Sequence, residues 1–127
     1  MSKRIAATAL CALFLTGHSR AAELTWDDPL LWIDLFAVAA DYSTTMDFVR
    51  YPRPGLDEEQ GLIAKSVMGR HPSQASVRYY FAGVALSHLA LRYTLPKPYG
   101  DVVLYVGIAT HARAAYGNYH LGARFSF

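Results

Sequence analysis

Three long, mainly apolar stretches follow one another along the chain, separated by polar or proline-containing connectors. We expect three helices, at about residues 29–49, 77–95 and 99–119. Two of the apolar runs are rich in Ala and Leu, which favours helix over strand. Asp28 followed by Pro29 is a typical helix start, whereas Pro52 and Pro96 follow the first two stretches. The pattern therefore predicts an all-α fold.

Each stretch has about the length that crosses a bilayer, which is roughly 20 mostly apolar residues. Each also carries an ionisable or imidazole side chain near its middle, namely Asp41, His88 and His111. Such groups are costly in lipid, so they usually face a partner or a cavity. We therefore expect a three-helix transmembrane bundle within residues 23–127, in which the polar groups meet in the interior.

Residues 1–22 resemble a cleavable export signal: a positively charged start, the apolar run Ile5–Leu15, and a small-residue exit that ends at Ala21 or Ala22. An uncleaved anchor is the alternative. This leader holds three of the 12 Lys and Arg, which leaves nine against ten Asp and Glu in the mature chain. A nearly neutral mature chain gives no reason to expect a nucleic-acid partner.

The positive charges are unevenly distributed about the expected spans. If the mature N-terminus lies outside, only Arg92 and Lys97 fall on the outer side. The inner side then holds Arg50, Arg53, Lys65, Arg70, Arg78, Arg113 and Arg124. This distribution follows the positive-inside rule. It predicts a bacterial inner-membrane protein with a periplasmic N-terminus and a cytoplasmic C-terminus, against the alternative of a soluble periplasmic helical domain.

Polar side chains recur on one face of the first and third stretches. On the first, Asp41 and Thr45 share a face with Asp34. On the third, His111 and Asn118 lie among small residues that allow close helix packing. The expected packing residues are Gly107, Ala114, Ala115 and Gly122. The expected buried polar cluster is Asp41, Thr45, His88, His111 and Asn118.

The sequence favours no particular chemistry for this cluster. Its two His and one Asp are suitable metal ligands, but they come from separate stretches and lack metal-binding spacing, so a metal site stays open. The only cysteine, Cys11, lies in the leader, and no nucleophile, phosphate-loop or zinc-protease motif occurs. We expect no cofactor, and the sequence leans against an enzyme.

The tail differs from the helices in its pattern. From Tyr119 to Phe127, large apolar residues alternate with polar or small ones, which is typical of a strand. We therefore expect a short strand-like segment at the C-terminus.

The chain resembles a set of small, uncharacterised bacterial and phage helical membrane proteins. The shared elements are Asp41-x-x-Thr44-Thr45, Gly69-x-x-Pro72-Ser73 and Asn118-x-x-x-Gly122, together with a His in the second helix. Members often carry Asn-Pro before the glycine, where this chain has residues 61–65, Gly-Leu-Ile-Ala-Lys. The resemblance implies a helical membrane protein and allows a phage origin with a role in lysis or the envelope.

These observations lead to one expected function and one rival within the membrane. We expect a non-enzymatic structural or partner-binding component whose partners are the bilayer and other membrane proteins or a second copy. The rival is an ion- or proton-handling element that uses the buried Asp and His side chains.

Overall fold

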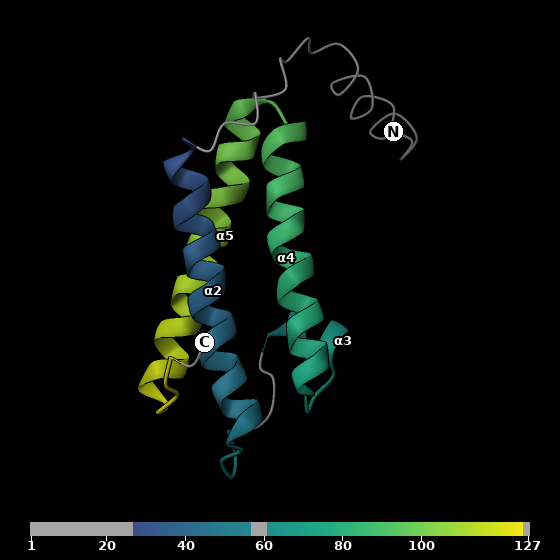
Figure 1. Ribbon diagram of the computed structural model, residues 1–127, viewed down its shortest axis with the longest axis vertical. Coiled ribbons are helices and arrows are strands. Elements are labelled where there is room, and N and C mark those ends of the chain that lie inside the picture. The colour runs from purple at the N-terminus through teal and green to yellow at the C-terminus, as the bar shows by residue number, and fades with distance from the viewer. Residues whose placement is uncertain (1–26, 57–60, 126–127) are drawn as a thin grey trace, which may run out of the picture.

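The computed structural model describes residues 27–56 and 61–125 (Figure 1). Within these ranges the chain forms four helices and no strand, which confirms the predicted all-α class. The helices are α2 (Pro29–Arg50), α3 (Leu62–Met68), α4 (Gln74–Thr94) and α5 (Lys97–His120). The expected export signal at residues 1–22 lies outside the described residues.

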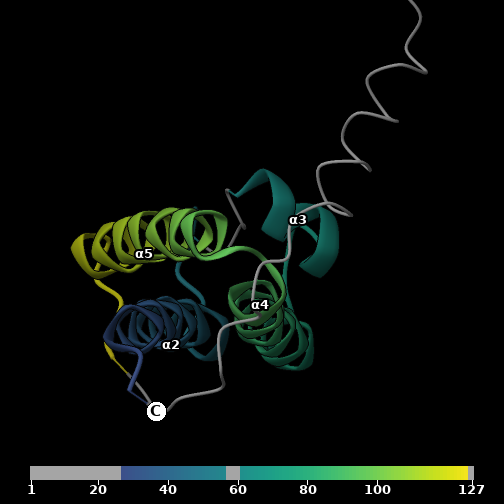
Figure 2. The same cartoon turned by 90° about the horizontal axis from the view of Figure 1, so that it is seen from above.

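The three long helices run side by side, each antiparallel to the one before it in the chain (Figure 1). Seen end-on, α2, α4 and α5 form a triangle, and α3 lies beside the first turns of α4 (Figure 2). The most extensive contact joins α2 to α5, which are parallel to one another. Residues from all three long helices therefore share one interior.

Side-chain caps set where two of the helices begin. The Asp28 carboxylate accepts a hydrogen bond from the Leu31 backbone N–H at 3.2 Å and so caps α2. At α4 the Ser73 hydroxyl accepts from the Ser76 N–H, while the Ser73 N–H donates to the Ser76 hydroxyl. This capping box satisfies two backbone donors at once, and α4 begins at Gln74, directly after it.

One apolar cluster of the interior lies toward the end of the bundle where α2 ends and α4 begins. Val38 and Met46 of α2 pack there against Val77 and Phe81 of α4, and Met68 of α3 closes the cluster. Met46 and Val77 are completely buried. Much of the remaining interior of the bundle is polar.

Residues 121–125 contain no strand, so the expected strand-like tail is wrong for this part of the chain. The chain instead turns after α5 at Gly122, whose φ of 95° suits glycine. Ala123 is buried, and the Arg124 backbone N–H donates to the Asp47 carboxylate at 3.1 Å. Contacts with α2, rather than pairing with another strand, hold this segment.

Length and hydropathy together select no membrane-crossing segment among the four helices of the described ranges.

Candidate functional site

Four buried aspartates are spaced six or seven residues apart along α2: Asp28, Asp34, Asp41 and Asp47. At most 8% of any of these residues is exposed. A buried carboxylate is costly unless it is paired, and each of the four has a partner from another part of the chain. We call this set the aspartate row.

Asp34 pairs with His88 of α4. The His88 Nδ1 atom lies 2.7 Å from Asp34 Oδ2, and the Asp34 side chain is completely buried. The second carboxylate oxygen, Oδ1, is buried without a hydrogen-bond partner. Gly107 of α5 allows this arrangement, because a Cβ atom there would overlap Asp34 Oδ1 and approach His88 Cε1 to 2.6 Å.

Asp41 forms a second carboxylate–imidazole pair with His111 of α5, where Nδ1 and Oδ2 are 2.8 Å apart. The Thr45 hydroxyl donates to the other Asp41 oxygen at 3.3 Å. The Asn118 amide in turn donates to the hydroxyls of Thr45 and Thr44, at 3.3 and 3.2 Å. Hydrogen bonds thus connect about one turn of α2 to about two turns of α5.

The two carboxylate–imidazole pairs are close neighbours. The ring centroids of His88 and His111 lie 5.9 Å apart, and Phe81 lies 6.0 Å from the second ring. In each pair the imidazole Nδ1 atom faces the carboxylate, and this contact orients the ring. The interior therefore holds two carboxylate–imidazole pairs side by side.

At the end where α2 begins, Arg92 pairs with Asp28, the first residue of the aspartate row. Its Nε atom lies 2.5 Å from Asp28 Oδ2, and its Nη1 atom lies 2.5 Å from Asp101 Oδ1 of α5. Burial raises the pKa of Asp28, but the Arg92 hydrogen bond and charge and the Leu31 N–H outweigh it and hold that pKa below its ordinary 3.8. One guanidinium thus joins the three long helices.

Asp47 is the last residue of the aspartate row, at the other end of α2. Its Oδ2 atom accepts from Arg53 Nη2 at 3.2 Å and from the Arg124 backbone N–H at 3.1 Å. The guanidinium of Arg53 also lies 5.1 Å from the centre of the Phe48 ring. This carboxylate therefore holds both the connector after α2 and the segment after α5.

The structure places the predicted cluster in two connected groups. Asp41, Thr45, His111 and Asn118 form one hydrogen-bonded chain. His88 lies beside that chain but pairs with Asp34, which shares a helix face with Asp41. The sequence does not show which imidazole faces which acid, because that choice depends on how the helices are staggered.

The predicted packing residues fall into two groups, one on α5 and one after it. Gly107 and Ala115 are buried on α5, and Ala114 is half-buried. Gly122 lies beyond the end of α5, in the turn that follows the helix. A Cβ atom at this position would lie 3.4 Å from Arg53 Nη1.

The sequence interpretation did not include the two ends of the row. Asp28 was expected only as part of a helix start and Arg92 only as a charge on the outer side of the membrane, and Asp47 was given no role. The available signal was the six- and seven-residue spacing of the four aspartates, combined with an arginine inside an otherwise apolar stretch.

Across residues 27–56 and 61–125, no group of three or more His, Cys, Asp or Glu is arranged to hold a metal ion. Comparison of the chain with protein-family models, with curated proteins and with solved structures finds no match.

Proposed function

We propose that this protein is a small, non-enzymatic component of a bacterial inner membrane, in which the three long helices span the bilayer and the aspartate row holds them together. The observation that carries the proposal is that buried charged side chains occur together with exposed large apolar ones. Charged and polar groups fill much of the interior, whereas many of the largest apolar side chains lie on the outside. Water would favour the opposite arrangement, and lipid favours this one.

Large apolar side chains are exposed on all three long helices. Phe36 is 74% exposed on α2, Leu86 is 65% exposed on α4, and Val106 is 59% exposed on α5. Large apolar side chains exposed on every long helix are expected of a surface that meets a membrane or a binding partner. Further exposed side chains on the long helices are Trp32, Ile33, Tyr79, Leu91, Tyr99, Val102, Tyr105, Tyr116 and Tyr119.

Helix length agrees with a spanning role. The three helices contain 22, 21 and 24 residues, or about 32–36 Å at 1.5 Å per residue, against a hydrocarbon core of about 30 Å. The average hydropathy of α2 includes Asp34, Asp41 and Asp47, although these side chains are buried and bonded. An average taken around the whole helix therefore understates how apolar its outer surface is.

The direction of the helices supports an orientation. The end of α2, the start of α4 and the end of α5 lie at one end of the bundle (Figure 1). Seven Lys and Arg belong to this end or to the adjoining connector and tail, whereas Arg92 and Lys97 belong to the other. We propose that the first end faces the cytoplasm.

Alkaline carbonate extraction of membranes tests the proposal. We expect the tagged full chain to stay in the membrane pellet and to need detergent to remain monodisperse after purification. Release into the carbonate supernatant, or a monodisperse protein in plain buffer, would instead indicate the soluble periplasmic domain. A control membrane protein and a control periplasmic protein in the same cells calibrate the two outcomes.

A second candidate function is proton handling, and the neighbouring Asp34–His88 and Asp41–His111 pairs favour it. Acids and imidazoles inside a membrane bundle commonly lie on proton paths. The adjacent rings, 5.9 Å apart, and the unpartnered Oδ1 atom of Asp34 are features that helix packing alone does not require.

Proteoliposomes that enclose a pH-sensitive dye distinguish proton handling from packing. A proton flux above that of protein-free liposomes, lost in Asp41→Asn, would favour the second candidate. Asparagine keeps a hydrogen-bond acceptor for His111 but no longer shares a proton, so packing is largely retained. A flux equal to that of protein-free liposomes would leave helix packing as the only proposed role of the two pairs.

A further inference from the structure

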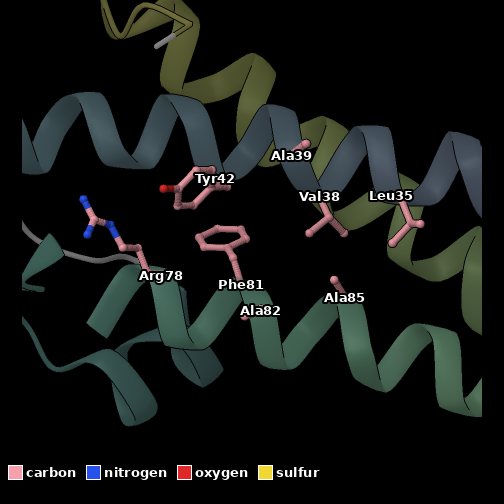
Figure 3. Close-up of a pocket in the computed structure, with 8 residues that line it drawn as sticks. All are labelled: Leu35, Val38, Ala39, Tyr42, Arg78, Phe81, Ala82 and Ala85. Atoms are coloured by element: carbon pink, nitrogen blue, oxygen red, sulfur yellow. The ribbon is translucent and has the colours of Figure 1, made fainter. Parts of the chain in front are cut away.

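An open groove of about 270 Å³ runs along the outside of the bundle between α2 and α4 (Figure 3). On α2 it is lined by Leu35, Val38, Ala39 and Tyr42, and on α4 by Arg78, Phe81, Ala82 and Ala85. Both sets follow the spacing i, i+3, i+4, i+7, so each is one face of its helix. The groove is therefore the seam between two antiparallel helices.

Small side chains keep this seam from closing. Ala39 on one wall and Ala82 and Ala85 on the other offer only methyl groups, so the lining leaves space that larger side chains would fill. The lining is apolar except at one end. There Figure 3 shows Arg78 near the Tyr42 hydroxyl, with Leu35 and Ala85 at the opposite end.

Arg78 is an available cation. It is exposed, and it forms no ion pair within the part of the chain that the structure describes. Arg92, the other arginine within α4, is buried between two carboxylates and cannot serve. Arg78 lies one turn after the start of α4, near the end of the bundle that carries most of the positive charge.

We propose that this groove binds one anionic phospholipid, with the phosphate on Arg78 and an acyl chain lying along the apolar seam toward Leu35 and Ala85. This inference rests on the proposed membrane location. In a spanning bundle, a residue one turn from the end of a helix lies near headgroup depth, and a lipid tail runs from there toward the bilayer centre, parallel to the helices. The groove has the same polarity: its cation lies at the end nearest the headgroups, and its apolar walls run toward the bilayer centre.

The geometry favours a lipid over another helix. The hollow is small, at about 270 Å³, and lies between the side chains of two helices, so a flexible hydrocarbon chain fits it more readily than a helix about 10 Å across. Charge complementarity selects the headgroup, since a guanidinium binds phosphate through several strong hydrogen bonds.

Native mass spectrometry of the full chain, released from mild detergent containing equal amounts of phosphatidylglycerol and phosphatidylcholine, tests the inference. We expect one retained phosphatidylglycerol and little phosphatidylcholine. Arg78→Gln should lower phosphatidylglycerol retention by about five- to tenfold, because one charge-assisted contact is lost. Ala82→Leu should lower retention of both lipids by filling the seam.

Arg113→Gln is the matched control. Arg113 is exposed on α5, in the half that lies at the same end of the bundle, but it does not line the groove. Its substitution should leave lipid retention unchanged. Equal retention by wild type and Arg78→Gln, equal retention of the two lipids, or a second copy of the chain in place of lipid would each overturn the inference.

Carbonate extraction separates the two proposals. Protein that stays in the pellet but shows no Arg78-dependent lipid overturns only the lipid site. Protein that is released overturns the membrane location as well.

Discussion

The contact between Gly107 and the Asp34–His88 pair shows how closely the interior of this protein depends on single atoms. The glycine leaves just enough space for a buried carboxylate and an imidazole from two other helices. Polar groups in an interior stabilise it only when they can reach their partners. A glycine on α5 therefore makes room for a buried acid of α2 and its imidazole partner.

We expect Gly107→Ala to lower the free energy of unfolding by about 1–3 kcal/mol, because the new methyl group would displace Asp34 and His88. Gly83→Ala is the matched control on α4, where an added Cβ meets nothing within 4 Å. That change should raise stability by up to about 1 kcal/mol, since alanine favours helix. Denaturant titrations of both variants measure the difference; equal effects would contradict the packing described here.

We expect Asp41→Ala to cost about 1–3 kcal/mol, because His111 and Thr45 would lose their shared acceptor inside the bundle. Asp27→Ala, an exposed aspartate directly before the N-cap of α2, should change stability by less than about 0.5 kcal/mol. The same denaturant titrations provide the measurement. A similar loss in both variants would mean that general charge effects, rather than the Asp41–His111 pair, stabilise the fold.

At the scale of elements, the start of α2 has two roles. Asp28 caps the helix through the Leu31 N–H and also receives the Arg92 guanidinium, which extends to Asp101 on α5. One carboxylate therefore fixes both where α2 begins and how it is placed against the other two helices.

Acid should weaken this junction. The pKa of Asp28 is lower in the folded chain than its ordinary 3.8, so its contribution to stability is present above about pH 4 and is lost as pH falls through the folded value. We expect the stability difference between wild type and Asp28→Asn to shrink steadily below about pH 4. Thermal or chemical unfolding at a series of pH values measures it; a constant difference would show that the charge of Asp28 contributes nothing.

At the scale of the whole molecule, the helices bury acids and imidazoles and expose aromatic and aliphatic side chains. In water this arrangement would leave a small apolar core to offset the cost of ordering the chain. In lipid the same arrangement would be favourable, because each buried aspartate has a partner residue and the outward apolar groups would meet hydrocarbon.

A charge on the outer surface should therefore impair insertion. We expect Phe36→Glu to reduce the fraction of protein retained in carbonate-washed membranes, because a charge near mid-bilayer costs about 2.5–3.5 kcal/mol. Tyr51→Glu, which changes an exposed aromatic residue just beyond α2, should be retained like wild type. Equal retention of the two variants would argue against lipid contact at Phe36.

Much of the architecture was predictable, and part of the site was also. Proline positions, caps and apolar runs located the three long helices, because these signals act within a few residues. The alternating tail was misread as a strand, since alternation needs a partner strand to form and Arg124 finds Asp47 instead. His88 was assigned to the cluster without its true acid, because the partner is set by packing between distant segments.

By itself, the sequence determined that the chain is helical, that its helices are long, and that each carries a polar side chain in an apolar setting, because local propensity and periodicity are read within single segments. Only the tertiary structure decided which acid meets which base, that the C-terminal segment docks on Asp47, and that an apolar groove with a cation at one end lies between α2 and α4. These features depend on the stagger and spacing of helices, and both are fixed by side chains far apart in the chain.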